Sequence, residues 1–161
     1  MPTVLGVFDS EESAQQAIGR MKENGISEER ISLVAKRNEG QDMEAGGEMR
    51  GEEQDLTDGT VTGGALGGIG GILAGAGLLA VPGVGPILAA GPLAAGLSGV
   101  AAGGIAGALV DYGVDEDTGE RYAQEVEQGR ILVAAEETDE NRVSEVANIL
   151  RENGAYDVEQ H

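Results

Sequence analysis

The first 36 residues alternate between short apolar runs and one amphipathic segment. The run TVLGVF is rich in β-forming residues, and SEESAQQAIGRMKENG follows it. Asp9 is the expected cap of a helix, with Glu12 three residues further on. The apolar positions of this segment fall on one helical face: Ala14, Ala17, Ile18 and Met21. Asn24-Gly25 then stops the helix, and ISLVAK is a second apolar run, so the pattern predicts strand, helix, strand.

Residues 130–161 repeat this order. RILVAAEE is a predicted strand, Asp139 is the expected helix cap, and Asn153-Gly154 stops the helix before AYDVEQ. A shift of 129 positions superimposes both helix stops and both apolar stripes. The second stripe consists of Val143, Val146, Ala147 and Leu150. Two strand-helix-strand units are expected to combine as an α+β fold of the ferredoxin-like type, a βαβ-βαβ antiparallel sheet with both helices on one face.

The rest of the chain is then an insertion between the second and third strands of that sheet. Residues 37–59 form an acidic, glycine-rich stretch whose low hydrophobicity predicts a flexible linker. Residues 60–111 are apolar, and residues 112–129 predict a short helix in which Tyr122 and Val126 share a face. The expected organisation is therefore 1–36, 37–59, 60–111, 112–129 and 130–161.

The stretch from Gly59 to Val110 carries no charged residue in 52 positions, and 17 of these residues are Gly and 12 are Ala. Small residues recur there at intervals of four, namely Gly63, Gly67, Gly71 and Gly75 and, after the VPGVGP turn, Gly91, Ala95, Gly99, Gly103 and Gly107. Each Gly costs a helix about 1 kcal/mol relative to Ala, which close backbone contact between helices would have to offset. The pattern predicts an antiparallel helical hairpin, inserted between strands two and three, with these nine residues as its packing and interaction surface.

Three placements of this predicted glycine zipper remain open. It packs on itself and on the open face of the sheet, it associates with a membrane, or it joins copies of the chain into a homo-oligomer. A helix from Thr60 to Ala80 would be about 30 Å long, enough to cross a bilayer core. Against a membrane stand the small transfer energy of Gly and Ala, the absence of an aromatic belt, and the acidic flanking residues Asp58 and Asp111.

Charge and composition exclude several classes of function. The chain has 29 acidic and 10 basic residues, a formal charge of −19, which opposes contact with nucleic acid phosphates. It has no Cys, no Trp, and His161 as its one His, so disulfides, thiolate zinc sites and His-based acid–base catalysis are not expected. The chain has two Lys and eight Arg, a balance that, with the excess of acids, is typical of a protein from a salt-adapted, halophilic cytoplasm. The alternative is an ordinary acidic protein. No basic region precedes an apolar one at the N-terminus, so we expect a cytoplasmic location, with membrane association through residues 60–110 left open.

Sites for a phosphate or a metal are not predicted either. No Lys or Arg lies between Arg50 and Arg121, so the glycine-rich segment lacks the lysine of a phosphate-binding loop. DYGVDEDTGE lacks the residue order of a calcium loop, and its acids are more simply explained as the first turn of a helix. We therefore predict no catalytic residue, no cofactor and no metal.

Three segments carry a resemblance to a known family: TVLGVFDSEESAQQAIGRMKENGISEERISLVAK, VPGVGPILAAGPLAAGLSG and YGVDEDTGERYAQEVEQGRILVAAEETDENRVSEVANILRENGAYDV. The chain resembles the heat-induced stress protein YflT, or general stress protein 17M-like, family of bacteria and archaea. The most specific elements are the turn at residues 82–95 and the run from Gly113 to Tyr122. The resemblance implies a stress-response protein with no assigned catalytic activity, cofactor or site residues.

Together these observations predict a non-enzymatic, general-stress-associated protein. Its glycine-zipper hairpin would mediate membrane association or self-assembly, and no small-molecule substrate is identified. The alternative is a soluble sensor or binding module of ferredoxin-like type for a small ligand, by analogy of fold alone.

Overall fold

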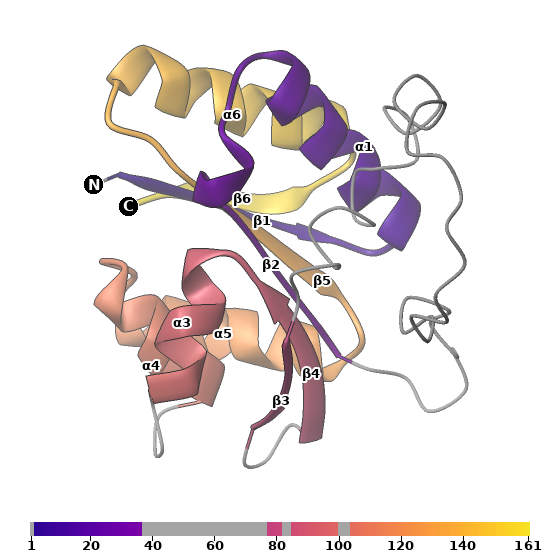
Figure 1. The fold of residues 1–161 in the computed structure, drawn as a ribbon, viewed down its shortest axis with the longest axis vertical. Coiled ribbons are helices and arrows are strands. Elements are labelled where there is room, and N and C mark those ends of the chain that lie inside the picture. Colours follow the sequence, from indigo (N-terminus) through magenta and orange to yellow (C-terminus); the bar gives the residue numbers. More distant parts are fainter. Residues whose placement is uncertain (1, 37–76, 82–84, 100–103) are drawn as a thin grey trace, which may run out of the picture.

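The computed structural model describes residues 2–36, 77–81, 85–99 and 104–161. In these residues an antiparallel sheet lies between two layers of helices, with strand order β3-β4-β2-β5-β1-β6 (Figure 1). The strands are β1 (Thr3–Phe8), β2 (Ile31–Lys36), β3 (Gly77–Val81), β4 (Gly85–Ala90), β5 (Ile131–Glu136) and β6 (Tyr156–Gln160). The helices are α1 (Glu11–Glu23), the 3₁₀ turn η1 (Glu28–Arg30), α3 (Pro92–Gly99), α4 (Gly104–Asp111), α5 (Glu116–Glu127) and α6 (Glu140–Glu152). The α+β class and the antiparallel sheet are as predicted.

The two repeated units fold as strand, helix and strand at the predicted places. Both predicted stripes are buried beneath α1 and α6, with Ala14, Ala17, Ile18 and Met21 on α1 and Val143, Val146, Ala147 and Leu150 on α6. Gly25 and Gly154 end these helices with positive φ angles of 81° and 92°, a conformation that favours glycine. Asp139 caps α6, because its carboxylate accepts a hydrogen bond from the Asn141 N–H at 2.8 Å.

The prediction that Asp9 caps α1 is wrong by one residue. Ser10 occupies the cap position in extended conformation, and its Oγ accepts a hydrogen bond from the Ser13 N–H at 3.3 Å. Asp9 instead pairs with Arg130, with 3.1 Å between Oδ1 and Nε. Both residues are good caps, so the contact with a distant arginine decides between them.

The central strands β1 and β5 are buried on both faces, because alternate side chains point into the two hydrophobic clusters. On β5, Val133 and Ala135 face α1 and α6, whereas Leu132 and Ala134 face the layer of α3, α4 and α5. Figure 1 shows these two helical layers on opposite sides of the sheet. The described helices of the charge-free stretch, α3 and most of α4, therefore cover the open face of the sheet, which is part of one of the three placements considered above.

The prediction of two long helices over residues 60–111 is wrong where the chain is described. Residues 77–81 and 85–90 are strands, and β4 pairs with β2 from Leu33↔Ala90 to Lys36↔Ile87. Without β4, strand β2 would be an edge strand, and its apolar side chains and backbone hydrogen-bonding groups would be exposed. Pairing of β4 with β2 therefore outweighs the weak helical preference of this Gly-rich segment. Residues 37–59, predicted to be the linker, and 60–76 lie outside the described residues.

The helical part after β4 is also divided in two. A Cβ built on Gly96 in α3 would lie 3.7 Å from the Cβ of Ala108 in α4. In one continuous helix, twelve residues would separate these positions by about 18 Å. α3 and α4 therefore pack against each other as separate short helices.

A buried carboxylate ties the repeated units together. The Glu137 side chain, 2% exposed, directly follows β5 and pairs with Arg30 at 3.3 Å and with Arg142 at 3.8 Å. Arg142 also donates hydrogen bonds to the carbonyl oxygens of Asn24, at 3.1 Å, and Gly25, at 3.4 Å. These contacts join the start of β2, the end of β5, the start of α6 and the loop that follows α1.

We expect the double variant Arg30→Met and Arg142→Met to lower the free energy of unfolding by about 2 kcal/mol or more, because it leaves the buried Glu137 carboxylate without a counter-charge. Urea unfolding monitored by circular dichroism measures this change. Arg20→Met is the control: Arg20 is exposed, has no ion pair in the described part of the chain, and should change stability by less than about 0.5 kcal/mol. Equal stability of the two variants would contradict a stabilising role for this cluster.

Candidate functional site

The structure describes four of the nine residues of the predicted zipper: Gly91, Ala95, Gly99 and Gly107. Gly63, Gly67, Gly71, Gly75 and Gly103 lie outside the described residues. Gly91 precedes α3, Ala95 and Gly99 belong to α3, and Gly107 belongs to α4. On α3, Leu93 and Leu97 are buried against the sheet and Ala95 is on the exposed side. The buried face of this helix is therefore made by its leucines, and Ala95 lies on another face.

Gly91 has a different role from the predicted one. Its φ angle is +79°, and a Cβ at this position would lie 2.1 Å from the Ile31 carbonyl oxygen. Only glycine lets the end of β4 approach the start of β2 so closely. Pro92 then begins α3, and the Leu93 N–H donates a hydrogen bond of 3.1 Å to the buried Ser32 Oγ. Gly91 and Leu93 thus fix the first turn of α3 onto β2.

Small residues outside the predicted stripe make the close contacts between helices. A Cβ built on Gly96 would meet Ala108 and, at 3.5 Å, the Tyr112 ring, and one built on Gly119 in α5 would lie 3.1 Å from the Ala106 carbonyl oxygen in α4. Sequence reasoning missed Gly119, although it shares the buried face of α5 with Tyr122 and Val126 at helical spacing. A glycine on a helical face whose other residues have large apolar side chains was the sequence signal for this close approach.

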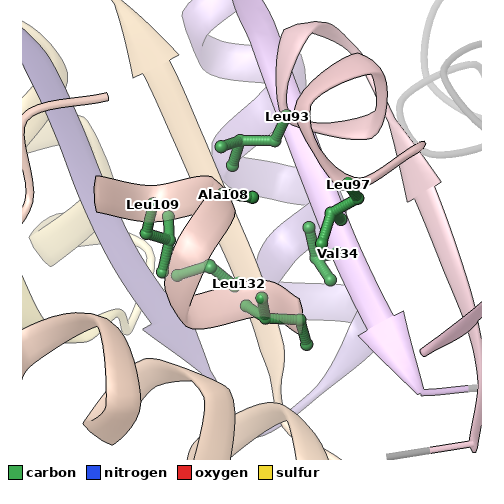
Figure 2. A pocket seen from close by; sticks show the side chains of 7 residues that line it. Val34, Leu93, Leu97, Ala108, Leu109 and Leu132 are labelled. Atoms are coloured by element: carbon green, nitrogen blue, oxygen red, sulfur yellow. The ribbon is translucent and has the colours of Figure 1, made fainter. Parts of the chain in front are cut away.

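Below α3 and α4 the apolar side chains form a crevice against the sheet (Figure 2). Its lining is wholly apolar: Val34, Leu93, Leu97, Ile105, Ala108, Leu109 and Leu132. It has no room for a water molecule. The geometry is that of packed core between the helices and strands β2 and β5, where dispersion contacts hold the layers together.

Polar side chains of α5 form hydrogen bonds and ion pairs with strand β6. The Tyr122 hydroxyl donates a hydrogen bond of 2.8 Å to the Asp157 carbonyl oxygen, and burial, together with the Asp157 and Glu159 carboxylates, raises the pKa of Tyr122. Arg121 pairs with Asp157 at 3.1 Å and also with Glu159. Asp157 has a positive φ of 55° where the β1–β6 register shifts, so these contacts hold a bulge in the edge strand.

A second group of the same kind lies beside it. Arg130 pairs with Glu125 and Asp9 and lies over the Tyr156 ring, 5.5 Å from its centroid. The Tyr156 hydroxyl donates a hydrogen bond of 2.8 Å to Glu125. This cluster joins the end of α5 to the start of β6 and, through Asp9, to the residue that follows β1, whereas the cluster at Arg121 joins α5 to β6.

Of the acids in DYGVDEDTGE, Asp111 ends α4, and Asp115, Glu116 and Asp117 form the start of α5. Asp115 caps α5, accepting a hydrogen bond of 3.0 Å from the Thr118 N–H, and this bond lowers the pKa of the Asp115 carboxyl.

The His161 Nε2 lies 3.1 Å from a Glu159 carboxylate oxygen. Among the residues that the structure describes, no three His, Cys, Asp or Glu side chains are grouped so that they could hold a metal ion.

No family model, curated protein or solved structure matches the chain. Of the helices that the structure describes, none combines the length and the apolar character needed to cross a membrane.

The close approach of α4 and α5 can be tested at Gly119. We expect Gly119→Leu to lower the free energy of unfolding by about 2 kcal/mol, because the larger side chain must push the two helices apart. The control is Gly19 in α1, where a Cβ would meet nothing within 4 Å, so that Gly19→Ala should stabilise by up to about 1 kcal/mol. Gly119→Ala places a Cβ 3.1 Å from the Ala106 carbonyl oxygen, so it should raise the free energy of unfolding by less than Gly19→Ala does. Equal gains from the two alanines, measured by urea unfolding, would show that α4 and α5 are not in close contact.

Proposed function

We propose that the chain is a non-enzymatic, general-stress-associated protein that acts by self-assembly through its charge-free segment. The observation that carries this proposal is the position of that segment in the fold: strand β3, which lies within it, is one edge of the sheet. We further infer that the body is ferredoxin-like. The strand order β2-β5-β1-β6, with α1 and α6 on the same face, supports that inference.

Electrostatics favours contact between copies at this end of the molecule. Each chain has a formal charge of −19, so most approaches bring carboxylates against carboxylates. The stretch from Gly59 to Val110, which includes β3, β4, α3 and most of α4, contributes no charge. Two copies therefore meet there at the lowest Coulombic cost.

Self-assembly is better supported than membrane association. The large apolar side chains of α3 and α4, such as Leu93, Leu97 and Leu109, are buried against the sheet and are not available to lipid. Among the side chains that the structure describes, Val110 is the one large apolar group that is exposed, at 44%. The apolar crevice beneath α3 and α4 gives no support to the alternative of a module for a small ligand, because this crevice does not admit even a water molecule.

The association with stress rests on the resemblance to the YflT family. One of its two most specific elements, residues 82–95, includes β4, Gly91 and the start of α3. The close approach of Gly91 to Ile31 gives that element a structural purpose. This structural role agrees with the resemblance, which implies no assigned catalytic residues.

Self-assembly should depend on protein concentration and on salt. We expect sedimentation velocity to show a growing dimer fraction as protein concentration rises, and a further increase from about 0.1 M to about 1 M NaCl, because the screening length falls from about 10 Å to about 3 Å. Flotation with phospholipid vesicles in the same buffers serves as the comparison for membrane association. A chain that stays monomeric at all concentrations and salts, or that associates only with the vesicles, would refute the proposal.

A further inference from the structure

The two edges of the sheet are built differently. At one edge, β6 has the sequence YDVEQ and contains the bulge at Asp157. Asp157 and Glu159 are charged, and both pair with Arg121. Bulges and charged side chains are the means by which edge strands avoid pairing with other chains. This edge is therefore protected.

The opposite edge lacks these features. β3 has the sequence GLLAV, without charge or proline, and it pairs with β4 in regular register from Gly77↔Ala89 to Val81↔Gly85. In the described part of the chain, no strand pairs with its outer side. Its outward backbone N–H and C=O groups form a template for another strand.

We propose that β3 pairs antiparallel with β3 of a second copy about a twofold axis, so that the two sheets become one continuous sheet. This inference rests on the self-assembly proposed above and names the surface that performs it. An isologous contact requires a surface that complements itself, and an uncharged antiparallel strand meets that requirement.

Charge favours a second copy over another partner. β3 and its neighbour β4 are uncharged, and the next strand, β2, ends on the basic residue Lys36. Two acidic chains that meet here bring no carboxylate of β2, β3 or β4 against its counterpart. A basic partner would be drawn instead to the acidic surface elsewhere on the molecule.

Distances between spin labels on the two copies test this arrangement directly. The chain has no cysteine, so Leu88→Cys on β4 and Gln160→Cys on β6 each introduce a single labelling site outside the proposed contact. Neighbouring strands are about 4.8 Å apart, so in the joined sheet the two Leu88 backbones lie about 15–20 Å apart and the two Gln160 backbones at least about 50 Å apart.

Electron–electron double resonance on the full chain, at a concentration where sedimentation shows dimer, gives both distances. A short Leu88 distance together with a long Gln160 distance supports pairing through β3. A long Leu88 distance in a dimer overturns pairing through β3 and leaves self-assembly in place. A chain that is monomeric by sedimentation overturns both proposals.

Proline substitution adds a second test that separates association from folding. In an antiparallel edge strand, successive residues direct their N–H groups alternately inward and outward. Of Leu78→Pro and Leu79→Pro, one should therefore remove an N–H that bonds β4, and the other an outward N–H. We expect the variant with the less disturbed thermal unfolding to be monomeric. If it forms dimers as readily as the unmodified chain, pairing through β3 is wrong.

Discussion

The fold depends on β5, the strand that joins the two repeated units. β5 pairs with β1 on one side and with β2 on the other, so the first unit holds a strand of the second between its own two strands. Its side chains are buried on both faces, with Val133 in one cluster and Leu132 in the other. A strand buried on both faces requires two covering layers, and α1 and α6 supply only one of them. The chain must therefore provide a second apolar layer.

The charge-free segment, together with α5, supplies that layer. Leu93 and Leu97 of α3 and Leu109 of α4 pack on the face of the sheet that α1 and α6 leave open. Gly96 and Gly119 let α3, α4 and α5 approach closely over that face. Small residues therefore serve the packing of helices within one chain, while the uncharged strands β3 and β4 extend the sheet beyond β2. One segment thus completes the core and extends the sheet to β3, the edge at which we propose that copies associate.

Much of the repeated body could be predicted from the sequence. Helical spacing identified the buried faces of α1 and α6 and the pair Tyr122 and Val126, because their period depends only on local geometry. The stops at Gly25 and Gly154 were equally local. Ser10 and Asp9 could not be ranked as caps, because the contact between Asp9 and Arg130 joins residues 121 positions apart.

The apolar segment could not be predicted in the same way. A spacing of four among Gly and Ala permits a helix, but small side chains provide little burial to favour it over a strand. GPILAA becomes a strand because the edge of β2 is available, and Gly91 turns the chain because the Ile31 carbonyl lies against it. Both depend on contacts between residues that are distant in the sequence. The close contact at Gly119 could not be predicted for the same reason.

Hydrogen–deuterium exchange of the full chain tests most directly whether this segment closes the second face of the sheet. Closure of that face requires that the amides of Ile87–Ala90 and Ile105–Leu109 exchange slowly, with protection close to that of β5, and that added phospholipid vesicles leave their protection unchanged. Exchange in these two stretches at the rate of an unfolded chain, while β5 stays protected, would contradict it.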